Sequence, residues 1–334
     1  MARVFVLSKR PEGLPTLDDF AEATWADEPL HDGEVRVEPL FVSVDPYLRG
    51  RMSDARSYVA PFEVGQAITS SAIGRVLETS APGLRIGDLV RGESPWATSY
   101  VANAANLWRL PETSDVRPSA YLGVLGMTGL TAYVGLTLFG GIQPGDEVLV
   151  TAGAGAVGSV VGQLARIFGA RVVGSAGGAH KVGQLAQLGF NAGIDYHAVD
   201  FSEALASSFP AGISLFFDNV GGRQFEAALH RMKDFGRIVS CGAISHYNDT
   251  ELPPGPRGLE GIVVRRRLKI QGFIVSDHLS LYSEYLRKAM TWVREGQLVS
   301  LETTSRGFES LPQAFLSLFR GGNVGKMVVE VGAP

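Results

Sequence analysis

A glycine cluster between an apolar strand and a helix is the feature that most constrains this chain. Residues 146–152 predict a strand and residues 157–168 predict a helix, with Gly153-Ala154-Gly155-Ala156-Val157-Gly158 between them. This is the G-x-G-x-x-G pattern in a strand-to-helix context: its glycines permit a tight turn, a close approach of a pyrophosphate, and close helix packing. The free N–H groups at the helix start then attract phosphate. The sequence therefore predicts a dinucleotide-binding unit.

The segments after this cluster continue the alternation of strands and helices. Strands are predicted at residues 171–175, 213–217, 237–240 and 268–275, and helices at 180–188, 223–232 and 281–294. Such alternation is typical of a parallel sheet in an α/β fold. Residues 1–120 instead hold short strand-like runs between turns, without a long amphipathic helix. The last thirty-odd residues return to short strands, and the strand predicted at 326–331 can rejoin the N-terminal domain.

Composition narrows the possible functions. A length of 334 residues suggests about two domains. The net charge of -4 gives no basic footprint for nucleic acid, and a single cysteine excludes an internal disulfide. The six histidines are dispersed, so we expect no catalytic zinc and no metal site. No G-x-S-x-G hydrolase motif occurs, and Cys241 is interpreted as a buried small side chain.

One stretch is weighed against a membrane span. Residues 118–145 carry no charge, but six glycines between residues 123 and 141 interrupt them and no Lys/Arg cluster flanks them. They predict a buried helix. The N-terminus lacks the long apolar core of a signal peptide, so we expect a soluble, cytoplasmic protein that contacts no membrane.

The end of the second predicted strand indicates which nicotinamide cofactor is bound. NAD sites carry an Asp or Glu about 20 residues after the glycine motif, which binds the ribose 2′-hydroxyl. Here the strand runs into Ser175-Ala176-Gly177-Gly178, and no acid precedes Asp195. Small residues leave room for a 2′-phosphate, and Lys181 can supply its counter-charge, although an ordinary solvated lysine is an equal alternative. The missing acid favours NADP(H).

Segments spread over nearly the whole chain carry a family resemblance. They are residues 10–15 (RPEGLP), 44–52 (VDPYLRGRM), 126–133 (GMTGLTAY), 154–158, 217–222 (FDNVGG), 241–248 (CGAISHYN) and 323–326 (NVGK). Because these segments occur together and in this order, the sequence resembles the zinc-free medium-chain dehydrogenases/reductases. Within that family it resembles the NADP-dependent alkenal double-bond reductases.

The resemblance implies a GroES-like β-barrel substrate domain, residues 1–123 completed by 300–334, and a Rossmann domain, residues 124–299. It implies that the cofactor lies in the cleft between them and that the protein is a homodimer. Lys181, Ser175 and Tyr196 would surround the 2′-phosphate. The remaining cofactor-binding residues would be Gly153, Gly155, Ala156, Val157, Gly158, Asn219, Cys241, Gly242, Ala243, Ile244, Ser245, Tyr247, Phe273, Ile274, Val275 and Asn323.

The implied reaction reduces the C=C bond of an α,β-unsaturated aldehyde or ketone. It needs a hydride at the β-carbon and a proton for the resulting enolate, whose oxygen a hydroxyl group can stabilise. We take Tyr247 as the catalytic hydroxyl and Tyr47 as the second candidate, with a structural role in the barrel as the alternative for Tyr47. His246 departs from the small or hydroxyl residue common in relatives, so substrate choice is expected to differ.

Two other functions remain open at this stage. One is quinone reduction with NADPH, since zinc-free relatives of the same fold reduce quinones. The other is an NADPH-binding protein without catalysis. The natural substrate cannot be read from the sequence, because the pocket depends on loops such as residues 52–62 and 245–258.

Overall fold

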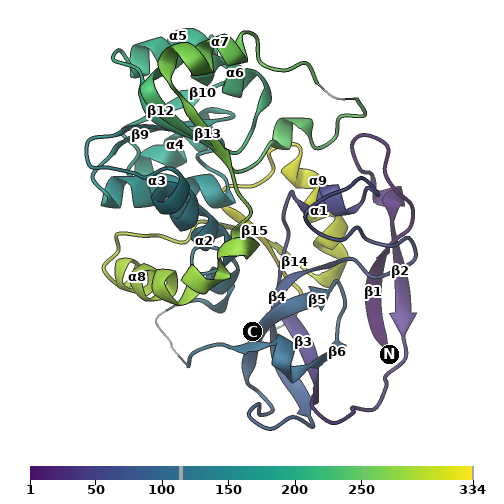
Figure 1. Cartoon of the computed structure of the whole chain (residues 1–334). Coiled ribbons are helices and arrows are strands. Elements are labelled where there is room, and N and C mark those ends of the chain that lie inside the picture. The colour runs from purple at the N-terminus through teal and green to yellow at the C-terminus, as the bar shows by residue number, and fades with distance from the viewer. Residues whose placement is uncertain (113–115, 252, 333–334) are drawn as a thin grey trace. The chain divides into compact units, whose positions relative to one another are not determined.

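The chain forms two compact units, with helices and strands labelled in Figure 1. The computed structural model describes residues 1–112, 116–251 and 253–332. Unit 1 comprises Met1–Leu122 and Glu302–Pro334, and unit 2 comprises Gly123–Leu301.

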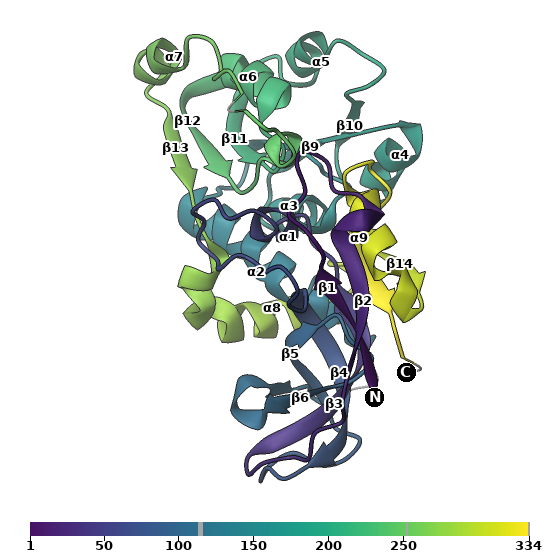
Figure 2. The same ribbon diagram turned by 90° about the vertical axis from the view of Figure 1, so that its right-hand side faces the viewer.

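Unit 2 is built on a six-stranded sheet in which every pairing is parallel. Its strands are β8 (Glu147–Val150), β9 (Arg171–Ala176), β10 (Ala192–Asp195), β11 (Ile213–Asp218), β12 (Met232–Ser240) and β13 (Lys269–Gly272). The order is β10-β9-β8-β11-β12-β13, and Figure 2 shows β11, β12 and β13 side by side. The order reverses between β8 and β11, which is where ligands bind in open α/β sheets.

Helices cover both faces of this sheet. They are α2 (Met127–Val134), α3 (Ala156–Ile167), α4 (Ala179–Gln187), α5 (Phe201–Ser208), α6 (Gly222–Arg231), α7 (Leu259–Arg266) and α8 (Tyr282–Arg294). Figure 1 shows α5, α6 and α7 grouped on one face and α2 and α3 on the other. Apolar residues of the strands and of α5 to α7 form a core that includes Leu149, Phe216 and Leu229.

The register of the parallel strands determines which residues lie next to one another at their carboxyl ends. Gly174, Val150, Phe217, Val239 and Gln271 stand opposite one another in successive pairs across β9, β8, β11, β12 and β13. The residues that follow this row therefore emerge together at one edge. The predicted cofactor-binding segments of unit 2 begin at this edge.

Unit 1 is mainly antiparallel. Its strands are β1 (Ala2–Leu7), β2 (Phe20–Trp25), β3 (Glu34–Ser43), β4 (Thr69–Thr79), β5 (Leu89–Pro95), β6 (Tyr100–Asn103), β7 (Trp108–Arg109), β14 (Glu302–Arg306) and β15 (Lys326–Glu330). β1 and β2 form a ribbon, and the larger sheet has the order β14-β15-β3-β4-β5-β7, with β6 also pairing with β3. β15 pairs antiparallel with β3, which confirms that the terminal strand rejoins the N-terminal domain.

The structure corrects several predicted elements. The tail contains a helix, α9 (Leu311–Leu318), whose apolar face packs into the unit 1 core beside Trp96. β12 begins already at Met232, where a helix was predicted, and bends at Phe235 with a positive φ of 61°. β13 ends at Gly272 rather than at residue 275, because a 3-10 turn follows over Val275–Leu281.

The uncharged stretch at residues 118–145 is mostly buried, as predicted, although Met127, Leu138 and residues 143–145 are exposed, and it is not one helix. It comprises a 3-10 turn at Pro118–Leu122, α2, and a π-helical turn at Gly135–Phe139. A side chain on Gly129 would overlap the Val124 carbonyl and the Tyr285 hydroxyl, so this glycine permits α2 to pack closely. No helix within the described part of the chain has the length and apolar character needed to cross a bilayer.

Candidate functional site

The glycine motif forms a cradle at the start of α3. Gly155 precedes the helix with extended backbone, no side chain caps the helix start, and no acidic residue lies in its first turn. A Cβ on Gly158 would overlap the carbonyl oxygen of Ala152, and one on Gly153 would lie 3.0 Å from Leu185 and 3.3 Å from Gly174. Uncapped N–H groups beside close-packed glycines fit the pyrophosphate of a dinucleotide.

The end of β9 carries no carboxylate, as the sequence indicated. Gly178 has a φ of +89° and its N–H donates 2.9 Å to Asp195 Oδ1, which also accepts from the N–H of His197. These two hydrogen bonds hold the pKa of Asp195 below its usual value. The Ser175 hydroxyl is fully buried and donates 2.6 Å to Gln224 Oε1, so in this structure it is used within the fold.

Lys181 and Tyr196 flank this strand end from α4 and from the turn after β10. Burial lowers the pKa of Lys181, and within the described residues its ammonium has no hydrogen bond or ion pair. Tyr196 is 37% exposed, and its hydroxyl lies 2.9 Å from the position that a Cβ on Gly177 would take. A free cation and a phenol at a strand end without an acid fit a 2′-phosphate.

The ends of β8 and β11 are joined by a buried hydrogen-bond network that the sequence motifs do not indicate. Asp218 Oδ1 accepts 2.7 Å from the Thr151 hydroxyl and 3.1 Å from the N–H of Val220, and Oδ2 accepts 3.0 Å from the N–H of Gly221. The amide of Asn219 donates 2.8 Å to the Thr151 carbonyl. Burial raises the pKa of Asp218 despite these donors. The network fixes the turn that carries Asn219.

The segment after β12 folds back onto this turn. The N–H and the hydroxyl of Ser245 both donate to the Val220 carbonyl, at 3.1 and 2.5 Å. Tyr247 caps the short 3-10 turn Ile244–His246, and its hydroxyl lies 3.2 Å from the position of a Cβ on Gly242. The Asn219 carbonyl lies 3.3 Å from the same position. The Tyr247 hydroxyl and Asn219 therefore come together at the carboxyl edge of the sheet.

Other predicted residues of unit 2 have identifiable surroundings. His246 Nδ1 lies 2.7 Å from Asp249 Oδ2. Burial, and then the charge of Asp218, raises the pKa of the Cys241 thiol to about 12, so the thiol stays protonated. Phe273 follows β13 and stacks on Phe139 with ring centroids 5.0 Å apart, and Ile274 and Val275 begin the next 3-10 turn.

Over residues 1–112, 116–251 and 253–332, no three His, Cys, Asp or Glu side chains group together to hold a metal ion.

Two predicted residues, Tyr47 and Asn323, belong to unit 1. Burial, and then the charge of Asp45, raises the pKa of Tyr47, which packs against the unit 1 core. Asp45 Oδ1 lies 3.0 Å from Lys326 Nζ, and both side chains are buried. Asn323 donates 2.7 Å to the Gly325 carbonyl, in the turn before β15.

The arginines of the 44–52 motif anchor neighbouring loops. Arg49 donates to the carbonyl of Gly13 at 2.8 Å. Arg51 donates to the carbonyl of Ala60 at 3.0 Å and lies 4.1 Å over the Phe62 ring. The motif thus places Tyr47 between a buried ion pair and two arginine anchors.

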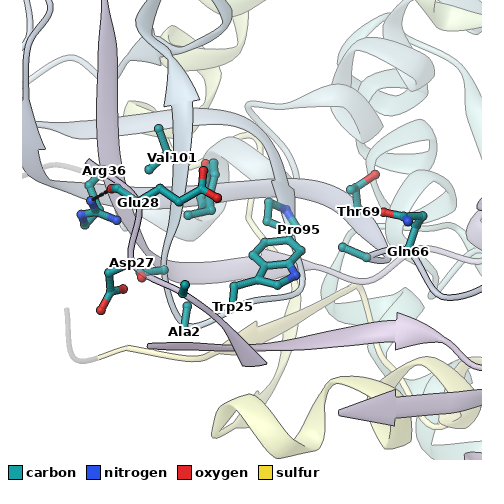
Figure 3. Close-up of a pocket in the computed structure, with 13 residues that line it drawn as sticks. Ala2, Trp25, Asp27, Glu28, Arg36, Gln66, Thr69, Pro95 and Val101 are labelled. Atoms are coloured by element: carbon teal, nitrogen blue, oxygen red, sulfur yellow. Dashed lines mark hydrogen bonds between the residues drawn. The ribbon is translucent and has the colours of Figure 1, made fainter. Parts of the chain in front are cut away.

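A separate hollow of about 610 Å³ lies in unit 1 (Figure 3). Trp25, Asp27, Glu28 and Arg36 line it, but Asp27 binds the N-terminal amine at 2.6 Å and Arg36 donates to the Glu28 carbonyl. None of the predicted site residues lines this hollow, and its charged groups are largely used within the fold.

The fold and the cradle define a two-unit dinucleotide-binding protein. The family model for the N-terminal domain of oxidoreductase matches residues 3–110, and the model named zinc-binding dehydrogenase matches residues 156–295. The NADPH-dependent curcumin reductase of Escherichia coli is 39% identical over 334 residues, 98% of this chain and 96% of that protein. Prostaglandin reductase 1 of Bos taurus is 40% identical over 334 residues, 98% of this chain and 99% of its own.

Solved structures agree with these sequence matches. CurA from Vibrio vulnificus in complex with NADPH superposes with a TM-score of 0.93 and 38% identity, covering 99% of this chain and 100% of that one. The chain belongs to the zinc-free, NADP-dependent medium-chain dehydrogenases/reductases, in the alkenal reductase group.

Proposed function

We propose that this protein uses NADPH to reduce the C=C bond of an α,β-unsaturated aldehyde or ketone. The observation that carries the proposal is full-length similarity to proteins named curcumin reductase and prostaglandin reductase. The glycine cradle and the acid-free end of β9 support NADP(H) as the cofactor. NADPH supplies the hydride that is added to the β-carbon.

In this proposal the cofactor is held by the edge of the unit 2 sheet. Gly153 to Gly158 bind the pyrophosphate through backbone N–H groups, and Lys181 and Tyr196 bind the 2′-phosphate. Ser175 joins them only if its hydroxyl leaves Gln224. Asn219, residues 241–247 and residues 273–275 line the rest of the site in unit 2.

The protein's own chemical task is to stabilise and protonate the enolate. The Tyr247 hydroxyl is a neutral donor fixed near Asn219, and aimed at the developing enolate oxygen it would stabilise that charge. The proton ends on the α-carbon, so the product is a saturated carbonyl compound. Tyr47 is the second candidate donor, and its raised pKa makes it a weaker acid than an ordinary tyrosine.

The experiment is an NADPH-oxidation screen of 2-alkenals, alkenones and quinones with each product identified. We expect turnover with the enals and enones and a product saturated at the C=C bond. Formation of only the allylic alcohol contradicts the proposal. Turnover with quinones alone favours quinone reduction, and binding without turnover on the whole panel favours a non-catalytic role.

The homodimer and the cytoplasmic location also belong to this proposal. In the part of the chain that the structure describes, β13 pairs only with β12, and Ile270 on it is 37% exposed. An open strand edge can pair with its copy about a two-fold axis. Sedimentation should then give twice the 35.6 kDa chain mass, and a monomer contradicts it.

The proposed cytoplasmic location is compatible with the single unpaired thiol, Cys241, because such a compartment is reducing. Cell fractionation tests this location.

A further inference from the structure

Two polar side-chain atoms converge over Gly177, directly after β9. The Tyr196 hydroxyl and His197 Nε2 each lie 2.9 Å from the position that a Cβ on Gly177 would occupy. The two rings lie 4.3 Å apart between centroids, in a tilted contact. Any side chain at residue 177 would collide with both atoms, so the glycine keeps this small space open between them.

The position of this space relates it to the ribose of a bound dinucleotide. In a βαβ dinucleotide site, the group at the end of the second strand faces the 2′ position of the adenosine ribose. Here the second strand is β9, Gly177 is the residue after it, and Lys181 lies in the first turn of the helix that follows. Tyr196 N–H donates 3.3 Å to the Ala176 carbonyl, which fixes the Tyr196–His197 turn against this strand end.

We infer that His197 is a further contact to the 2′-phosphate of NADPH and contributes to the preference for NADPH over NADH. The inference rests on the proposed binding of NADP(H) in unit 2. His197 is exposed, and within the described chain its ring nitrogens have no hydrogen bond or ion pair. Its imidazole is therefore available to a ligand, in contrast with Ser175, whose hydroxyl is used by Gln224.

An imidazole N–H of His197 can donate to a phosphate oxygen beside the positive charge of Lys181. The ionisable groups around it are Asp195 at the end of β10, Tyr196 beside it, and His180 and Lys181 in the first turn of α4. The Asp195 carboxylate is turned to the N–H groups of Gly178 and His197, which partly offset its repulsion of a phosphate. The imidazole N–H of His197 and the ammonium of Lys181 would then both donate to one phosphate.

The test compares cofactor affinities of the full-length protein by titration calorimetry. For His197→Ala we expect NADPH to bind about fivefold more weakly and NADH binding to be unchanged. Adenosine 2′,5′-bisphosphate should lose affinity in parallel with NADPH, whereas adenosine 5′-monophosphate should not. His197→Lys, which keeps an N–H donor for the phosphate, should retain NADPH affinity.

Two controls separate the possible failures. His31→Ala removes an exposed histidine of unit 1 and should change neither affinity. Lys181→Ala should weaken NADPH binding roughly 10–150-fold without affecting NADH. If Lys181→Ala has this effect and His197→Ala has none, or weakens both cofactors equally, the inference about His197 is wrong. If Lys181→Ala also leaves the NADPH/NADH preference unchanged, the proposed phosphate site itself is wrong.

Discussion

The hydroxyl of Thr151, just after β8, donates a 2.7 Å hydrogen bond to the buried carboxylate of Asp218 at the end of β11. The same hydroxyl accepts a hydrogen bond of 2.9 Å from the N–H of Asn219. These two strands are the ones between which the sheet order reverses, so the pair fixes the point where a dinucleotide site opens. Asn219 is held in place by Thr151, 68 residues away in the sequence, through its N–H and its side-chain amide.

Asp218→Ala should lower the free energy of unfolding by about 2–3 kcal/mol, because it leaves the buried hydroxyl of Thr151 and the part-buried N–H of Val220 without an acceptor. Asp218→Asn should cost less than about 1 kcal/mol, since its amide oxygen can still accept and a neutral group avoids the burial cost of the charge. Urea unfolding at neutral pH measures both. Equal losses in the two variants would contradict the assigned role.

The Asp45–Lys326 pair gives a second stability prediction. Lys326→Met should lower the free energy of unfolding by about 3–5 kcal/mol, because it leaves a buried carboxylate without its partner. Adding Asp45→Asn should recover part of that loss. The matched control is Lys288→Met, which breaks an exposed pair with Glu284 and should cost less than about 1 kcal/mol. Similar losses for Lys326→Met and Lys288→Met would show that the buried pair is unimportant.

Gly158→Ala should abolish binding of both NADPH and NADH, because the new Cβ would overlap the Ala152 carbonyl and displace the start of α3. Its control is Gly183→Ala within α4, where a Cβ meets no atom within 4 Å. That variant should bind NADPH and NADH normally, and its free energy of unfolding should rise by up to about 1 kcal/mol. Fluorescence titration measures affinity and thermal unfolding measures stability. Normal NADPH binding by Gly158→Ala would refute the cradle.

Tyr247→Phe should lower kcat about 10²-fold, the typical loss for removing one oxyanion donor. The affinity for NADPH should change less than about twofold, because the ring is kept. Tyr47→Phe is the comparison, and its loss of kcat should be smaller. If Tyr47→Phe lowers kcat about 10²-fold and Tyr247→Phe does not, then Tyr47 and not Tyr247 is the hydroxyl that stabilises the enolate.

The sequence predicted the parallel sheet because its strands are short apolar runs bounded by glycine. This pattern is local in the sequence, so it can be recognised without knowledge of the folded structure. It also predicted that residues 326–331 rejoin the N-terminal strands, as the pairing of β15 with β3 confirms. It missed α9, whose helix depends on packing against Trp96 and Phe20 from distant segments. The bend at Phe235 was missed as well, since a positive φ at a phenylalanine has no local signal.

The site was less accessible to sequence reasoning than the fold. The glycine motif predicted the position of the cradle, because its spacing places glycines where the tight turn, the pyrophosphate and the helix packing require them. The Thr151–Asp218 bond and the Ser175–Gln224 bond join residues 67 and 49 positions apart, and only the folded arrangement of strands and of α6 brings them together. His197 had one available signal, its position next to Tyr196, but its approach to Gly177 depends on the turn after β10.

The most direct measurement of the central claim uses NADPH deuterated at the transferable position of the nicotinamide C4, with an alkenone substrate in ordinary water. The account predicts a saturated ketone that carries deuterium on its β-carbon, with its carbonyl group intact, as read by NMR. Deuterium on the former carbonyl carbon, in an allylic alcohol, would contradict it.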